Sequence, residues 1–147
     1  MLYSLFVFLG GVLAALAVGL GAMGAHALET RLTPEQLQTY HTAVDYLMFH
    51  ALGLVLVGLL GFQVPLRRLV IAGVAMLIGV LLFSGFLFAW IATGWKLFVY
   101  PVPVGGTSFV IGWLMLASGA WARRHGRIEG IKVCTLRDMH ERDIPGR

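Results

Sequence analysis

The sequence predicts an all-α integral membrane protein, an up-and-down bundle of four transmembrane helices. Hydrophobic residues make up 59% of the 147 residues and charged residues only 12%, whereas a soluble domain has about 25% charged residues. The charges are also unevenly spaced, because residues 1–25 and 69–95 contain none. Gaps of this length match the roughly 20 apolar residues that a helix needs to cross a bilayer.

The first predicted helix covers residues 2–25, and small residues gather on one of its faces. This small face consists of Ala14, Ala17, Gly21 and Gly24. Because small side chains let membrane helices approach closely, we interpret the face as a packing seam. No Lys or Arg precedes the apolar stretch, in contrast to a signal peptide, so we expect this helix to be retained.

The second predicted helix, residues 34–61, has a well-marked start. Thr33 supplies an N-cap hydroxyl and Gln36 completes a capping box, with a proline at the first helical position. The first turns of this helix are amphipathic, and the chain becomes predominantly apolar only after Asp45. We therefore expect the helix to begin outside the hydrocarbon layer and to enter it near Asp45.

The third predicted helix covers residues 69–93 and ends at Gly94, a residue type that suits a helix C-terminus. Two prolines and a glycine pair follow within residues 100–106, so this segment is predicted to be a turn rather than regular helix. A fourth helix is expected over residues 104–122, with Gly112 on a small face.

These helices make up one transmembrane domain, residues 1–122, which is followed by a cytoplasmic tail, residues 123–147. Basic residues near helix ends are concentrated on one side of the membrane, at Arg67, Arg68, Arg123, Arg124 and Arg127. The opposite side has only Arg31 and Lys96. By the positive-inside rule both termini are expected in the cytoplasm. The expected location is the plasma membrane of a bacterium, its inner membrane.

Four motifs occur in a fixed order along the chain. They are Gly21-Ala22-Met23-Gly24-Ala25-His26, Tyr46-Leu47-Met48-Phe49-His50, Leu82-Phe83-Ser84-Gly85 and Pro103-Val104-Gly105-Gly106-Thr107-Ser108-Phe109-Val110-Ile111-Gly112-Trp113. Together they resemble the small membrane proteins of the domain of unknown function 423 family, which includes animal transmembrane protein 256. The resemblance covers residues 2–122 and implies a four-helix membrane protein without an assigned activity. The packing and motif residues selected on this basis are Gly21, Gly24, His26, Tyr46, His50, Ser84, Gly85, Pro103, Gly105, Gly106 and Gly112.

Ionisable groups at membrane depth are costly and are therefore candidates for a functional site. His26, Asp45 and His50 are the candidate metal ligands, and His26 with His50 would be the axial ligands of a haem. A metal site needs three or four ligands, and the chain contains no His-x-x-x-His pair. The alternative interpretation is structural, since polar residues commonly join helices within membranes. We expect no cofactor, with a metal ion or haem as the alternative.

The sequence favours a non-enzymatic membrane protein, a subunit, assembly factor or stabiliser of a larger membrane complex. No serine lies in a nucleophile-elbow motif, and Cys134, in the tail, is the only cysteine. The expected partners are the lipid bilayer and other membrane proteins or further copies of the chain. Nucleic acid is not expected, because the basic residues form short clusters between apolar runs. The alternatives are metal- or haem-linked redox or sensing through His26 and His50, and a small oligomeric transporter.

Overall fold

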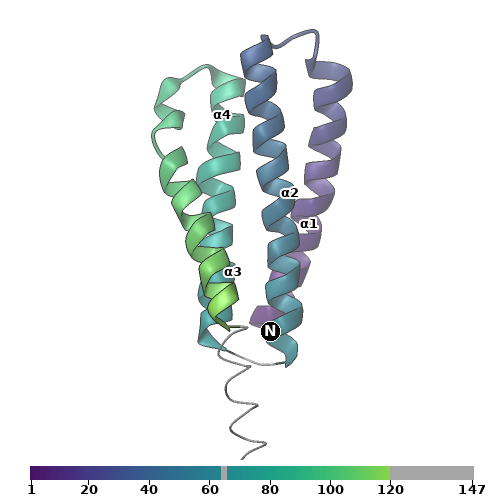
Figure 1. Ribbon diagram of the computed structural model, residues 1–147. Helices are drawn as coiled ribbons and strands as arrows, with labels where there is room; N and C mark the ends of the chain where they lie inside the picture. The colour runs from purple at the N-terminus through teal and green to yellow at the C-terminus, as the bar shows by residue number, and fades with distance from the viewer. Residues whose placement is uncertain (64–65, 120–147) are drawn as a thin grey trace, which may run out of the picture.

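The computed structural model describes residues 1–63 and 66–119, and within them every regular element is helical (Figure 1). Four segments are long and apolar enough to cross a membrane: Leu2–Leu28, Pro34–Gln63, Arg67–Thr93 and Lys96–Gly119. The predicted all-α architecture with four apolar helices is therefore confirmed. The predicted tail, residues 123–147, and the last residues of the predicted fourth helix lie outside the described residues.

The first two crossings begin close to where the sequence places them. The α-helix α1 (Leu2–Met23) continues into one π-helical turn, η1 (Gly24–Leu28). The second crossing is a single α-helix, α2 (Pro34–Gln63). Its capping box is confirmed, since the Gln36 N–H donates to Thr33 Oγ1 at 3.3 Å and the Thr33 N–H donates to Gln36 Oε1 at 3.1 Å.

The third crossing is not one uniform α-helix. It consists of α3 (Arg67–Gly79), a π-helical segment η2 (Val80–Gly85) and α4 (Phe86–Thr93). It ends at Gly94, whose φ of 72° lies in the left-handed region that favours glycine. The sequence predicts this end but not η2, because a local change from α- to π-helical hydrogen bonding does not alter the apolar composition of a segment.

The start of the fourth crossing contradicts the prediction of a turn over residues 100–106. A short 3₁₀-helix, η3 (Lys96–Val99), leads into a helix that begins at residue 102 and is described to residue 119, called the fourth helix below. Proline is tolerated in a first turn because the first N–H groups of a helix have no intrahelical acceptor. Pro103 and the glycine pair therefore occupy the first turns of the fourth helix instead of interrupting it.

α2 is the central helix of the bundle. In its most apolar stretch of 18 residues, 50% of the residues are buried, compared with 17% in the corresponding stretches of the first and fourth crossings. α1 packs along α2, and the fourth helix packs against α3 and η2 and contacts the middle of α2. The N-terminus lies at the same end as the start of α3, since the Tyr3 hydroxyl donates to the Leu66 carbonyl (Figure 1).

Close contacts between α1 and α2 determine their register. A Cβ added at Gly10 would lie 2.7 Å from the Ala51 carbonyl oxygen, and one at Gly24 would lie 2.7 Å from the Tyr40 ring. Gly10 is therefore level with Ala51, and Gly24 is level with Tyr40, so the two segments are antiparallel. The main apolar core lies in the half of the bundle that holds the N-terminus. It consists of Phe6, Leu54, Val57, Leu69, Ala72, Met76 and Leu116.

Candidate functional site: an aromatic groove around His50

His50 is a buried polar residue near the middle of α2, with 5% of its surface exposed. Tyr46, one turn earlier, stacks on Phe83 of η2 at a ring-centroid distance of 4.5 Å. This contact places the Tyr46–His50 turn level with the middle of the third crossing, Arg67–Thr93. At such a depth no water compensates an unpaired polar atom, so each ring nitrogen of His50 requires a partner.

Both ring nitrogens of His50 have one. Trp113 of the fourth helix donates its indole Nε1–H to His50 Nε2 at 3.1 Å. Because an indole N–H only donates, Nε2 must be the unprotonated acceptor. Nδ1 then has the proton and donates it to the Tyr46 carbonyl oxygen at 2.7 Å. The two hydrogen bonds select one tautomer of the neutral imidazole and join α2 to the fourth helix.

Aromatic rings surround this histidine–tryptophan pair. Phe109 stacks on the His50 ring at a centroid distance of 3.3 Å and an interplanar angle of 15°. Tyr46 makes an angle of 23° with His50 and of 24° with Phe83. Stacked rings of this kind gain energy beyond the area that they bury. Phe109, His50, Tyr46 and Phe83 thus form a row of contacting rings at one level of the bundle, in which Phe83 and Phe109 are tilted by 57° to each other.

These rings line a groove of about 640 Å³. Its lining residues come from α2, η2 and the fourth helix and are Tyr46, Phe49, His50, Phe83, Gly106, Phe109, Val110, Trp113 and Leu114. Phe49, Val110 and Leu114 are 63%, 58% and 61% exposed, so the groove opens sideways from the bundle. The Tyr46 hydroxyl makes no hydrogen bond within the part of the chain that the structure describes.

Glycines let the groove walls come together. A Cβ at Gly105 would lie 2.6 Å from the backbone nitrogen of Phe83, so the fourth helix and η2 are in backbone contact there. Gly79 leaves room for the Phe109 ring, which is thereby held against His50. Gly106 lines the groove itself, and a Cβ added there would be in ordinary contact with the Phe83 ring, at 3.8 Å.

The candidate metal ligands do not come together within one chain. His26 is exposed in η1, beyond the level at which Gly24 packs against Tyr40. On α2, Tyr40 and His50 are ten positions apart (50 minus 40), which corresponds to about 15 Å along the helix axis. Because His26 lies beyond the level of Tyr40, it is at least about 15 Å from His50 along this axis. Residues 1–63 and 66–119 contain no group of three or more His, Cys, Asp or Glu side chains that could hold a metal. A single chain therefore does not supply the pairing of His26 with His50 that the metal or haem hypothesis requires.

Asp45 lies well inside the second crossing. Tyr46 is level with Phe83, which precedes Thr93 by ten positions (93 minus 83), so Asp45 lies about 15 Å below that end of the bundle. A hydrocarbon layer about 30 Å thick would include it if the layer were centred on the bundle. The Asp45 side chain is exposed and makes no hydrogen bond or ion pair with the described residues. It ends an exposed polar stripe on α2 that consists of Gln38, His41 and Asp45.

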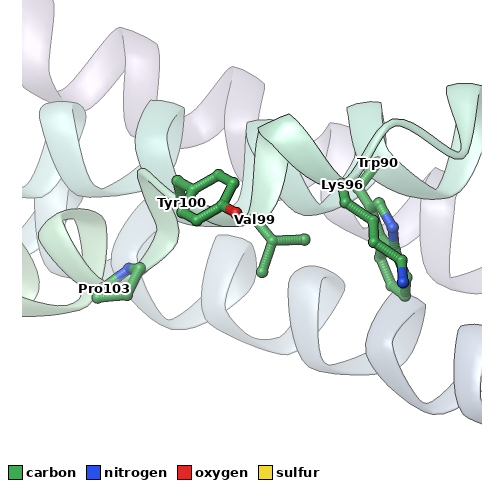
Figure 2. A pocket seen from close by; sticks show the side chains of 5 residues that line it. All are labelled: Trp90, Lys96, Val99, Tyr100 and Pro103. Atoms are coloured by element: carbon green, nitrogen blue, oxygen red, sulfur yellow. The ribbon is translucent and has the colours of Figure 1, made fainter.

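A second pocket, of about 500 Å³, lies where α4, η3 and the fourth helix meet. Its lining residues are Trp90, Lys96, Val99, Tyr100 and Pro103 (Figure 2). Lysine among aromatic side chains is typical of the membrane interface, where the apolar stem packs on rings and the ammonium group reaches headgroups and water. We interpret this pocket as part of the interfacial anchor of the bundle.

The remaining motif residues lie apart from the groove lining. Ser84 is buried in η2, and its Oγ has no hydrogen-bond partner among the described residues. Gly85 follows it and is exposed. Gly21 of α1 is in ordinary contact with α2, and Gly112 of the fourth helix is in close contact with α3.

Trp113 and Phe109 are site residues that the sequence analysis did not select. Their spacing of four positions places them on one face of a helix, which was the available signal. However, 63 positions separate Trp113 from His50, and no local pattern indicates that contact. The motifs that contain Phe83 and Trp113 contact the motif that contains Tyr46 and His50 only in the folded bundle.

Fold and groove together define a small helical membrane protein that crosses the bilayer several times. The family model described as "Protein of unknown function (DUF423)" matches residues 20–106. The UPF0382 membrane protein YwdK of Bacillus subtilis is 41% identical over 118 residues, which are 80% of this chain and 96% of the relative. A UPF0382 membrane protein of Staphylococcus epidermidis is 37% identical over 113 residues, which are 77% of this chain and 92% of the relative. The chain therefore belongs to the DUF423 family, as its motifs predict. No solved structure matches it.

Proposed function

We propose that this protein is a non-enzymatic subunit, assembly factor or stabiliser of a larger membrane complex. The exposed side chain of Asp45, inside the second crossing, is the observation on which the proposal depends, because an exposed carboxyl group at membrane depth is costly. The basic residues of the described chain lie near the ends of the crossings, at Arg31, Arg67, Arg68 and Lys96. His41, one turn earlier on the same exposed stripe, makes no hydrogen bond or ion pair with Asp45. A basic or hydrogen-bonding partner for Asp45 would therefore come from another protein.

The outer side of α1 supports the proposal independently. Gly11, Ala15 and Gly19 recur at every fourth position on this exposed side, and a Cβ at either glycine would meet nothing within 4 Å. The contact with α2 uses other residues, such as Gly10 and Gly24. Glycine lowers helix stability by about 1 kcal/mol relative to alanine in water. Small residues without an intramolecular contact are therefore suited to packing against a helix of another membrane protein.

The hydrogen bonds of His50 support a role without catalysis. A general base needs a ring nitrogen within reach of a substrate proton. In His50 one nitrogen accepts from Trp113 and the other donates to the Tyr46 carbonyl. Such a histidine joins helices and orders the core, which is the role expected of a structural subunit.

We further propose that both termini face the cytoplasm, in the inner membrane of a bacterium. Arg67 and Arg68 lie at the end of the bundle that holds the N-terminus, and Arg31 and Lys96 lie at the opposite end (Figure 1). The sequence adds three basic residues after the fourth crossing, Arg123, Arg124 and Arg127. The positive-inside rule and the bacterial sources of the relatives support this orientation and location.

Purification from native membranes in a mild detergent, followed by mass spectrometry, tests the proposed function. We expect at least one other membrane protein to co-purify with the wild type and to decrease severalfold with Asp45→Asn. Glu35→Gln is the matched control, because it also removes one acidic group from α2, but in the first turn. Co-purification should be unchanged by it. A wild-type protein that purifies as a lone monomer or homo-oligomer contradicts the proposal.

A further inference from the structure

We propose that the aromatic groove around His50 binds a lipid-soluble quinone, a neutral planar ring with carbonyl oxygens on an apolar tail. The inference goes beyond a role in a membrane complex and does not depend on a partner protein. It rests on where the groove opens, on the shape of its walls and on the hydrogen-bonding groups that it presents.

The position of the groove determines how an occupant reaches it. The groove lies level with the middle of the third crossing, and its exposed lining residues face outwards from the bundle. An occupant therefore enters sideways from the lipid. The lining contains no Asp, Glu, Lys or Arg, so nothing in it compensates a phosphate or carboxylate. The occupant is neutral and lipid-soluble, and a groove of about 640 Å³ is in the size range of small-molecule sites.

The walls favour a flat ring over a flexible acyl chain. Five of the nine lining residues are aromatic: Tyr46, Phe49, Phe83, Phe109 and Trp113. Phe49 is 63% exposed and Trp113 is 41% exposed, so both rings can contact an occupant. A planar conjugated ring gains stacking or edge-to-face contacts with such side chains, in addition to the energy of apolar contact.

The polar groups specify a hydrogen-bond acceptor on that ring. Tyr46 lines the groove, and its hydroxyl makes no hydrogen bond with the described residues; within the hydrocarbon an unpaired hydroxyl is costly. Its O–H group is available to donate, and a quinone carbonyl oxygen accepts. Haem fits less well, because Trp113 occupies the Nε2 atom of His50 that would ligate iron, and the propionates would face uncharged walls.

Binding of tritiated decylubiquinone to the full chain in phosphatidylcholine nanodiscs tests the inference, with empty nanodiscs as the measure of partition into lipid. We expect saturable binding above the empty-disc background. Val110→Trp places an indole in the groove and should weaken binding at least about tenfold. Val104→Trp is the matched control, since it makes the same change on the same helix, at a valine that is 57% exposed compared with 58%, but outside the groove. Its affinity should equal that of the wild type.

Tyr46→Phe tests the hydroxyl separately and preserves the ring. Loss of one hydrogen bond predicts about three- to tenfold weaker binding, whereas Tyr100→Phe, in the second pocket, should have no effect. The inference is wrong if the quinone binds no better than to empty nanodiscs, if Val110→Trp binds as the wild type does, or if n-decylbenzene, which lacks oxygen, displaces the quinone as well as unlabelled decylubiquinone. These experiments use the purified chain alone, so their failure is distinguishable from a failure to co-purify a partner.

Discussion

Replacing Gly105 with alanine tests the closest contact that shapes the groove. A Cβ at this position would lie 2.6 Å from the Phe83 nitrogen and 2.8 Å from the Leu82 carbonyl carbon. Both are backbone atoms of a helix, so no side-chain rotation relieves the overlap. At the adjacent Gly106, an added Cβ would lie 3.8 Å from the Phe83 ring, an ordinary van der Waals distance. The two glycines therefore differ chiefly in the space available for a methyl group.

This difference predicts the sign and size of the effect. Both Gly→Ala substitutions gain up to about 1 kcal/mol of helix propensity, and this gain cancels when the two variants are compared. Overpacking a well-packed site costs about 1–3 kcal/mol. We therefore expect Gly105→Ala to be less stable than Gly106→Ala by about 1–3 kcal/mol, with Gly106→Ala at least as stable as the wild type.

Reversible unfolding in mixed micelles of lipid and SDS, followed by circular dichroism, measures this difference. Each variant is compared by its free energy of unfolding, with the helical signal of the folded state as a check that both bundles form. Equal stability of the two variants would refute the backbone contact between the fourth helix and η2. A Gly106→Ala variant less stable than the wild type would contradict the ordinary contact distance between an added Cβ and the Phe83 ring.

Three further predictions concern the hydrogen bonds and the topology. Trp113→Phe keeps a ring but leaves the buried His50 Nε2 without a donor, so the free energy of unfolding should fall by about 1–2 kcal/mol in the same assay; an unchanged value would show that the bond does not stabilise the bundle. Thr33→Ala removes the capping hydroxyl and should lower the free energy of unfolding by about 0.5–2 kcal/mol. Thr33→Ser keeps a hydroxyl and should retain most of the stability. Equal losses in the two variants would contradict a hydroxyl cap. In a variant without the native cysteine, a membrane-impermeant maleimide applied to intact cells should label Lys96→Cys and not Arg67→Cys. The opposite labelling pattern would reverse the proposed orientation.

The depth of Asp45 illustrates where sequence reasoning stops. The local composition around Asp45 is mixed, which predicted that α2 enters the hydrocarbon there. Which part of the third crossing lies level with Asp45 depends on the register between the two helices, which the stacking of Tyr46 on Phe83 shows. Register between distant helices is a property of packed side chains and backbones. Hydropathy along one helix therefore does not reveal it.

The sequence by itself determined the four apolar crossings, the capping box at Thr33 and the end of the third crossing at Gly94, because hydropathy, caps and a left-handed glycine act within a few residues. It also selected Tyr46 and His50 as unusual residues through the motifs. Only the tertiary structure decided that Phe83, Phe109 and Trp113 complete a groove around them, because three helices far apart in the chain contribute its walls. The structure also begins the fourth helix at residue 102, with Pro103 in its first turn, and leaves the Asp45 side chain exposed.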